Sequence, residues 1–410
     1  MKRLFTLLSA SLLCTAISAQ TMKVYRGHVI TAVPAATAAD MKFTAEGKLS
    51  VMGNLFTTSE IDSITFDRST IKANTLNVAY APNNTWVTVS ADMAPHVAIT
   101  LKGDHVSVVA DADVAEEYTY ALAGSSNNGS FYMDGQYKST INLSALNLTN
   151  PDSAAICIDN GKRIKVELTN GNSTLADGTA NPRKACFFIN GHAEFSGNAS
   201  LTLTGNAKHA YASDEYTLIQ MDEGQGITIN HAANDGMHID QYLQMDSGSL
   251  NISGTAGDGI DVSVTKDATD EHNGEVIING GSITLAVSAN DVKGIKSESH
   301  TTINGGSINA NVSGNGSKGI SVGGNLLISQ AEGATTSIEM TVSGTTYKFT
   351  NPTTGLADSS KCRGIKVTGN YTLAGGTIHM TVTGVKAKGI SCDGTYTKTC
   401  LLYTSPSPRD

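Results

Sequence analysis

The stretch Val276–Ile283, VIINGGSI, recurs 25 positions later as Thr301–Ile308, TTINGGSI. After each copy the apolar residues alternate with polar ones, through Leu285 and Val287 in the first and Ala310 and Val312 in the second. Alternation with a period of two, β-branched residues and flanking glycine or asparagine are typical of short strands. The repeat therefore predicts strands that recur at a fixed interval along the chain.

A second recurring feature is a charged residue followed by glycine and an apolar residue. Its glycines are separated by 23, 35, 25, 45 and 25 residues, and they are Gly236, Gly259, Gly294, Gly319, Gly364 and Gly389. The two long intervals contain insertions, Lys266–Asn273 and Thr345–Lys361, and without them the period is about 23–25 residues. A repeat of this size indicates a solenoid, in which no unit buries its apolar face alone.

These features predict an all-β fold, a right-handed parallel β-helix of about nine or ten coils with a small N-terminal β module. Equivalent residues of successive coils then lie about 4.8 Å apart. One interior stack is expected to contain Ile260, Ile295, Ile320, Ile365 and Ile390. A second is expected to contain Val262, Val322, Val367 and Cys392.

The chain divides into five predicted segments. Residues 1–19, with Lys2 and Arg3 before an apolar run, indicate a signal peptide and hence a secreted or cell-surface protein. A small β module or cap is expected over 20–75, irregular entry strands over 76–130 and the regular β-helix over 131–399. Residues 400–410 break the repeat and have the form of a translated sequencing adaptor, so they are excluded from the prediction of the fold.

Composition narrows the classes of function. The formal net charge of −9 argues against a general nucleic-acid binder. After the signal peptide, no apolar run is long enough for a membrane span. Only one tryptophan, Trp86, is present, and Tyr211, Tyr216, Tyr242 and Tyr371 are expected to be scattered, which disfavours a flat aromatic sugar platform. We expect a monomer, and four cysteines within 20–399 leave their pairing open.

From residue 293 onwards, the position before the glycine changes from acidic to basic. With the basic residues that follow the Gly-Ile step, this predicts a ridge of six cations: Lys293, Lys296, Lys318, Arg363, Lys366 and Lys388. Two unit charges about 5 Å apart repel by roughly 3 kcal/mol at an effective dielectric of 20. Splayed side chains would relieve this repulsion, and so would regularly spaced anions of a bound uronate chain. The alternative is a solvated row of turns without a ligand.

The preceding coils carry acidic residues at corresponding positions. Asp235, Asp240, Asp258 and Asp261 lie on adjacent predicted coils, and Asp291 lies one coil further on. Calcium takes six to eight oxygen ligands, so these carboxylates are candidate ligands of one ion. The alternative is turn chemistry, in which an aspartate before glycine bonds nearby backbone amides.

Three sequence features carry a family resemblance: Phe131–Gly135, the run 146–150, and Gly257–Asp261 together with the Ile-Asn-Gly-Gly repeats. They resemble the calcium-binding parallel β-helix family of bacterial carbohydrate-binding domains, which are secreted by clostridia and gut Bacteroidales. The resemblance covers about 130–395. It implies a fold similar to polysaccharide lyases, bound calcium and non-catalytic binding of acidic polysaccharide such as polygalacturonate. The chain departs from the family in having one acid, not two, before each Gly-Ile step.

Two other functions remain open at this stage. A polysaccharide lyase of this fold would use calcium with a lysine or arginine base, and Asp258, Asp261, Lys293 and Lys296 supply those residue types. However, each of these residues is explained by the repeat, so a non-enzymatic protein is expected. The third possibility is a surface adhesin or structural stalk that binds a partner through the insertion at 345–361.

Overall fold

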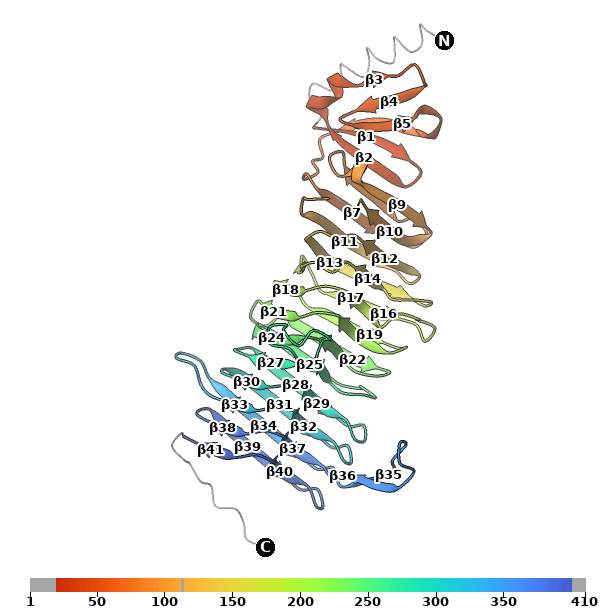
Figure 1. The fold of residues 1–410 in the computed structure, drawn as a ribbon. Coiled ribbons are helices and arrows are strands. Elements are labelled where there is room, and N and C mark those ends of the chain that lie inside the picture. Colours follow the sequence, from red (N-terminus) through yellow and green to blue (C-terminus); the bar gives the residue numbers. More distant parts are fainter. Residues whose placement is uncertain (1–19, 112–113, 400–410) are drawn as a thin grey trace.

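The computed structural model describes residues 20–111 and 114–399, and both the predicted signal peptide and the predicted adaptor lie outside these ranges. Figure 1 shows an elongated stack of strands with the N-terminal module at one end. Each regular coil contributes one strand to each of three faces. The predicted parallel β-helix with a small N-terminal β module is therefore confirmed.

One face is a 12-stranded sheet that contains every Gly-Ile step, and we call it the Gly-Ile sheet. Only its first pair, β9 with β10, is antiparallel, and the remaining neighbours are parallel. Its strands are β9 (Val97–Lys102), β10 (Asp104–Ala110), β12 (Gly129–Asp134), β14 (Ile156–Asp159), β17 (Ala185–Ile189), β20 (His209–Ser213), β23 (Met237–Asp240), β26 (Ile260–Ser263), β29 (Lys293–Ser297), β32 (Lys318–Val322), β37 (Arg363–Val367) and β40 (Lys388–Cys392). Ten of these strands, β12 to β40, begin successive coils, as the repeat predicts.

The other two faces belong to a 24-stranded sheet that divides into two parallel ladders. Strand β13 (Ser139–Asn150) pairs with both ladders and turns the corner between them at Ala145, whose φ is +47°. The first ladder contains β15 (Ile164–Thr169), β18 (Ala193–Gly197), β21 (Thr217–Met221), β24 (Tyr242–Ser247), β27 (Glu275–Ile278), β30 (Thr301–Ile303), β33 (Leu326–Ile328), β38 (Tyr371–Leu373) and β41 (Tyr396–Lys398). The second contains β16 (Ser173–Asp177), β19 (Leu201–Gly205), β22 (Gly226–Ala232), β25 (Ser249–Ile252), β28 (Ser282–Val287), β31 (Gly306–Val312), β34 (Thr336–Val342) and β39 (Thr377–Val382).

The N-terminal module is joined to the β-helix by continuous strand pairing, because β8 pairs with β2 and β7 pairs with β11. It also has a separate small core that includes Met22, Leu49 and Phe56. Its elements and the entry strands are β1 (Thr21–Arg26), β2 (Val29–Pro34), η1 (Ala35–Asp40), β3 (Lys42–Phe43), β4 (Lys48–Val51), β5 (Asn54–Thr57), η2 (Thr58–Glu60), β6 (Ser63–Asp67), β7 (Thr75–Tyr80), β8 (Trp86–Ser90), η3 (Ala94–His96) and β11 (Tyr118–Ser126). Late in the β-helix, the insertion at 345–361 forms an antiparallel hairpin of β35 (Tyr347–Thr350) and β36 (Ala357–Ser360) that projects from the coil (Figure 1).

The predicted interior stacks exist in the predicted register. In the first stack, each isoleucine lies opposite the next, from Ile260 through Ile390. Ile260, Ile320 and Ile365 are fully buried, whereas Ile390 in the last described coil is 40% exposed. In the second stack Ser297 replaces an apolar residue, and its hydroxyl bonds that of Thr301 at 2.7 Å, so the buried polar group is satisfied.

The glycine of each step is required because the coils approach closely there. A Cβ at Gly259 would lie 2.6 Å from the carbonyl oxygen of Gly294, and one at Gly294 would lie 2.6 Å from that of Gly319. A side chain larger than hydrogen would push neighbouring coils apart. The repeated glycine is therefore a packing requirement of the Gly-Ile sheet.

Two sequence-based expectations about side chains are resolved by the fold. The cysteines within 20–399 are all free thiols, Cys157, Cys186, Cys362 and Cys392. The expectation of scattered tyrosines is wrong, since Tyr216 and Tyr242 stack at 4.9 Å on adjacent coils. Within the described residues, no helix has the length and apolar character that crossing a membrane requires.

Candidate functional site

The Gly-Ile sheet carries two outward columns of residues, each formed by one position repeated from coil to coil. The first column lies just before the glycine and contains His209, Asp235, Asp258, Lys293, Lys318, Arg363 and Lys388. The second lies just after the Gly-Ile step and contains Ala212, His238, Asp261, Lys296, Ser321, Lys366 and Ser391. Both columns change from histidine and acid to base along the axis, so one surface has two chemically distinct halves.

In the acidic half, two histidines converge on one carboxylate. The Nδ1 atoms of His209 and His238 lie 3.2 Å and 3.4 Å from Oδ2 of Asp235. The two imidazole rings stack with centroids 4.5 Å apart. The other oxygen of Asp235 accepts a 2.7 Å hydrogen bond from the amide of Asp258, which fixes the orientation of the carboxylate.

Two further carboxylates surround His238. Oδ2 of Asp261 lies 3.2 Å from Nδ1, and Oδ1 of Asp240 lies 3.8 Å from Nε2. Contacts with Asp235 and Asp261 raise the pKa of His238 to about 10 against the opposing effect of burial. Burial alone would raise the pKa of Asp235, but the contacts of both histidines hold it well below its usual value.

The remaining acids of this half are individually held. Burial raises the pKa of Asp258 to about 6, although its Oδ1 accepts a 2.7 Å hydrogen bond from the amide of Lys293. Burial also raises the pKa of Asp240. Burial opposes ionisation of Asp261, but contacts with His238 and Lys296 outweigh it and lower the pKa. The acidic half is therefore a network of paired charges.

The five aspartates predicted as calcium ligands do not form one oxygen-only ligand set. Asp291 lies with the basic half, where its Oδ1 accepts a 3.1 Å hydrogen bond from Nζ of Lys318. Within residues 20–111 and 114–399, one group of three candidate ligands has all its ligand atoms within 4.8 Å of one another: His209, Asp235 and His238. These residues can hold a metal ion. Calcium prefers oxygen ligands, so this histidine-containing set does not fit calcium.

Sequence reasoning missed His209 because its coil lacks the glycine of the repeat. Ala210 stands there, so a search for charge followed by glycine passes over Lys208–Ala210. The available signal is the spacing, since His209 precedes Asp235 by 26 residues, close to one coil.

In the basic half, the cations are in register but are used within the protein. Lys318 is 15% exposed and donates to Asp291 and, at 2.6 Å, to the hydroxyl of Ser360 on the hairpin. Arg363 is 8% exposed, and its Nη1 donates at 2.7 Å to the carbonyl oxygen of Cys362. The expectation of side chains splayed into solvent is therefore wrong for Lys318 and Arg363.

The other cations of the ridge are more accessible. Lys296 pairs with Asp261 at 2.8 Å and with Glu298 at 3.4 Å, and Lys366 pairs with Asp393. Lys293 donates to the backbone oxygen of Asp291 at 3.1 Å. Lys388 is exposed. The six ridge cations outnumber the carboxylates of Asp291, Glu298 and Asp393 that contact them from the same coils, so this half keeps a positive balance.

Aromatic rings on the first ladder form a row rather than a platform. His192, Tyr216 and Tyr242 lie on successive coils, with centroid separations of 4.6 Å and 4.9 Å. Tyr216 and Tyr242 are within 17° of parallel, so each covers a face of the other. Because a sugar stacks on a ring face, this row offers little area for such contact.

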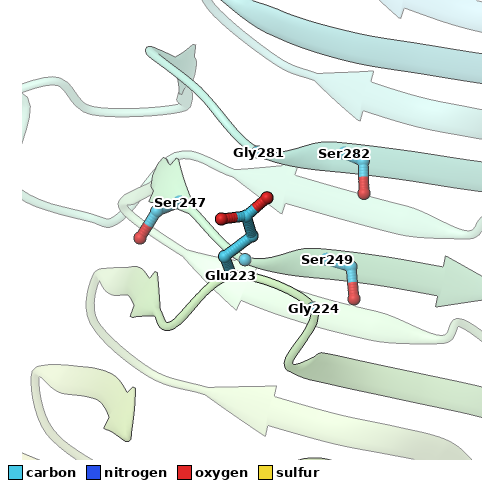
Figure 2. Close-up of a pocket in the computed structure, with 7 residues that line it drawn as sticks. Glu223, Gly224, Ser247, Ser249, Gly281 and Ser282 are labelled. Atoms are coloured by element: carbon cyan, nitrogen blue, oxygen red, sulfur yellow. The ribbon is translucent and has the colours of Figure 1, made fainter. Parts of the chain in front are cut away.

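A shallow pocket lies away from both columns, at the corner between the two ladders. It is lined by Glu223, Gly224, Ser247, Gly248, Ser249, Gly281 and Ser282. Figure 2 shows the Glu223 carboxylate in this pocket, with the side chains of Ser249 and Ser282 pointing the same way from neighbouring strands. Its small hydroxyl and glycine lining has no second charged group, so the columns remain the stronger candidate site.

Fold and site together define a parallel β-helix with an open, charged outer face. A family model described as carbohydrate-binding domain-containing protein matches residues 102–397. Because this match spans well over half of the chain, the protein belongs to that family.

A solved structure described as the polysaccharide lyase-like protein from C. thermocellum, as a gadolinium derivative, is similar in fold. The TM-score is 0.51 at 22% sequence identity, and the alignment covers 64% of this chain and 99% of that one. At this identity the likeness shows the fold alone. No curated protein matches the chain.

Proposed function

We propose that this protein binds an acidic polysaccharide, such as polygalacturonate, along the basic half of the Gly-Ile sheet without cleaving it. The family supplies the ligand class, carbohydrate. The observation that carries the choice of an acidic glycan is the cation register, because Lys293, Lys318, Arg363 and Lys388 lie on successive coils. Neighbouring strands are about 4.8 Å apart, a spacing close to one sugar unit of an extended uronate chain.

The contact would use the more accessible cations. Lys293, Lys366 and Lys388 border solvent, whereas Lys318 and Arg363 are tied to the protein and would act as a fixed positive background. A uronate carboxylate would compete with Asp393 for Lys366. Such exchange between exposed ion pairs is weak, about 0–1 kcal/mol per pair, so affinity would come from several coils acting together.

Proton inventory supports binding over catalysis. A lyase needs a base that is unprotonated at working pH. The pKa of Lys296 is raised by Asp261 in spite of burial, and that of His238 is about 10, so both keep their protons near neutral pH. The alternative, a polysaccharide lyase on this fold, requires another base.

Calcium, which the family resemblance implies, receives no step in this proposal because the described carboxylates do not form an oxygen-only set. Secretion or display at the cell surface rests on residues 1–19 and is proposed on that sequence signal alone. The adhesin alternative would place the contact on the hairpin of β35 and β36 and predicts no affinity for glycans.

The test is retention on polygalacturonate by the full chain and by the triple variant Lys293→Gln, Lys366→Gln and Lys388→Gln. Loss of three exposed contacts of up to about 1 kcal/mol each predicts roughly 10- to 100-fold weaker binding. The matched control changes three exposed lysines on other surfaces, Lys102→Gln, Lys138→Gln and Lys208→Gln, with the same change in net charge. Equal weakening by both triple variants would contradict the proposed surface.

The same samples separate the alternatives. Binding without release of unsaturated uronate ends is the expected result, whereas growing ultraviolet absorbance from such ends would establish the lyase. Retention on a neutral glucan equal to that on polygalacturonate would contradict a charge-based contact. Binding that is abolished by chelator and restored by calcium would contradict a contact that needs no calcium.

A further inference from the structure

We infer that His209, Asp235 and His238 form a binding site for a late first-row divalent metal ion of the zinc class, two imidazole nitrogens and one carboxylate being its protein ligands. The site lies in the acidic half, on β20, on β23 and on the turn before β23. It involves none of the lysines assigned to glycan contact. The inference therefore stands independently of the proposed function.

The spacing of the ligand atoms fits a small tetrahedral ion. Ligands about 2.0–2.1 Å from a tetrahedral centre are separated from one another by about 3.4 Å. The measured separations from Oδ2 of Asp235 are 3.2 Å to Nδ1 of His209 and 3.4 Å to Nδ1 of His238. An ion between these atoms would require only small movements of the side chains.

The two histidine nitrogens also lack ordinary partners. Nδ1 of His209 and Nδ1 of His238 are both buried and make no hydrogen bond of acceptable geometry within the described part of the chain. The side chains of His209 and Asp235 are only 12% and 9% exposed. Buried polar atoms normally have a partner, and two orphaned nitrogens that face one carboxylate oxygen indicate a missing ligand.

The surroundings have the features of an outer shell around a metal. The amide of Asp258 holds the non-ligating oxygen of Asp235 at 2.7 Å. Asp240 lies 3.8 Å from Nε2 of His238, on the side of the ring away from the ligand group. A carboxylate beside the second ring nitrogen is the usual arrangement for a metal-bound histidine. Asp261, 3.2 Å from Nδ1 of His238, is available as a fourth ligand.

The kind of donor decides the class of ion. Imidazole suits zinc, copper, iron and nickel, whereas calcium and magnesium are held by carboxylates, carbonyls and water. With three protein ligands, the remaining coordination position would face the outer surface of the sheet. Water or an oxygen of an external molecule would take that position.

The experiment titrates the metal-depleted full chain with zinc and, separately, with calcium, and follows heat and bound metal after dialysis. We expect one zinc ion per chain and no calcium at this site. The variant His209→Gln should lose the ion, while His231→Gln, which changes an exposed histidine on the same strand face region, should keep it. Asp240→Asn should weaken zinc binding by about 10- to 100-fold, as expected for an outer-shell carboxylate.

Cobalt provides a second measurement that does not depend on how well each variant folds. Cobalt bound to the unaltered chain should give the intense visible absorption of a tetrahedral site, and zinc should displace it. Undiminished zinc stoichiometry in the double variant His209→Gln, His238→Gln would overturn the inference. So would calcium binding in place of zinc, or a chain that binds neither, in which case the cluster is an internal ion-pair network.

Discussion

The coils around β23 and β26 and the coils around β32 and β37 have the same backbone and the same interior, but opposite charge outside. Ile260 and Ile320 occupy one buried column, while the outward residues before the glycine are Asp258 in one coil and Lys318 in the other. The comparison teaches that the repeat fixes the scaffold and leaves the outward columns free to vary. Function in this protein therefore has to be sought in the outward columns.

The largest expected effect tests the shared interior. Ile260→Ala and Ile320→Ala should each lower the free energy of unfolding by about 2–5 kcal/mol, because each leaves a cavity in a fully buried stack. Ile390→Ala should cost less than half as much, since Ile390 is 40% exposed. Urea denaturation followed by circular dichroism measures all three. A clear difference between Ile260→Ala and Ile320→Ala would break the comparison.

The next effect tests the close approach of the coils. Gly259→Ala and Gly319→Ala should each cost about 1–3 kcal/mol, because the added Cβ would lie 2.6–2.7 Å from a carbonyl oxygen of the next coil. The control is Gly161→Ala, whose nearest neighbour would be 3.8 Å away. The same denaturation experiment serves here. If Gly161→Ala were as costly as the other two, crowding between coils would not be the reason for the repeated glycine.

A smaller effect distinguishes buried from exposed cations within the basic half. Lys318→Met removes the partner of Asp291 and Ser360 and should cost about 1 kcal/mol. Lys388→Met lies on an exposed position and should change stability by less than about 0.5 kcal/mol. Faster proteolysis of the β35–β36 hairpin in Lys318→Met alone would sharpen the assignment. Equal behaviour of both variants would mean that the contact with Ser360 does not hold the hairpin.

Much of the scaffold could be predicted from the sequence. Strand alternation, the glycine step and the period of about 23–25 residues lead to the coil register, and the isoleucine stack follows from that register. Each of these signals is local or recurs at a fixed spacing, so a single sequence contains it. Even Ser297, which interrupts the second stack, stands at the position that the repeat gives it.

The site was predicted less well, because its properties depend on contacts between coils. The acids and cations were found, but their pairing was not, since the Lys318 contact with Ser360 crosses an insertion of variable length. His209 was missed because its coil lacks the glycine that marks the others. The stack of Tyr216 on Tyr242 was missed because the tyrosines occur at irregular intervals. Side-chain partners of this kind are set by three-dimensional proximity.

The most direct test of this division of labour is polygalacturonate binding, measured side by side for three forms of the full chain in chelator. These are the unaltered protein, the variant Lys293→Gln, Lys366→Gln, Lys388→Gln and the variant His209→Gln, His238→Gln. The account predicts roughly 10- to 100-fold weaker binding for the lysine variant alone. Weaker binding by the histidine variant, with the lysine variant unchanged, would contradict it.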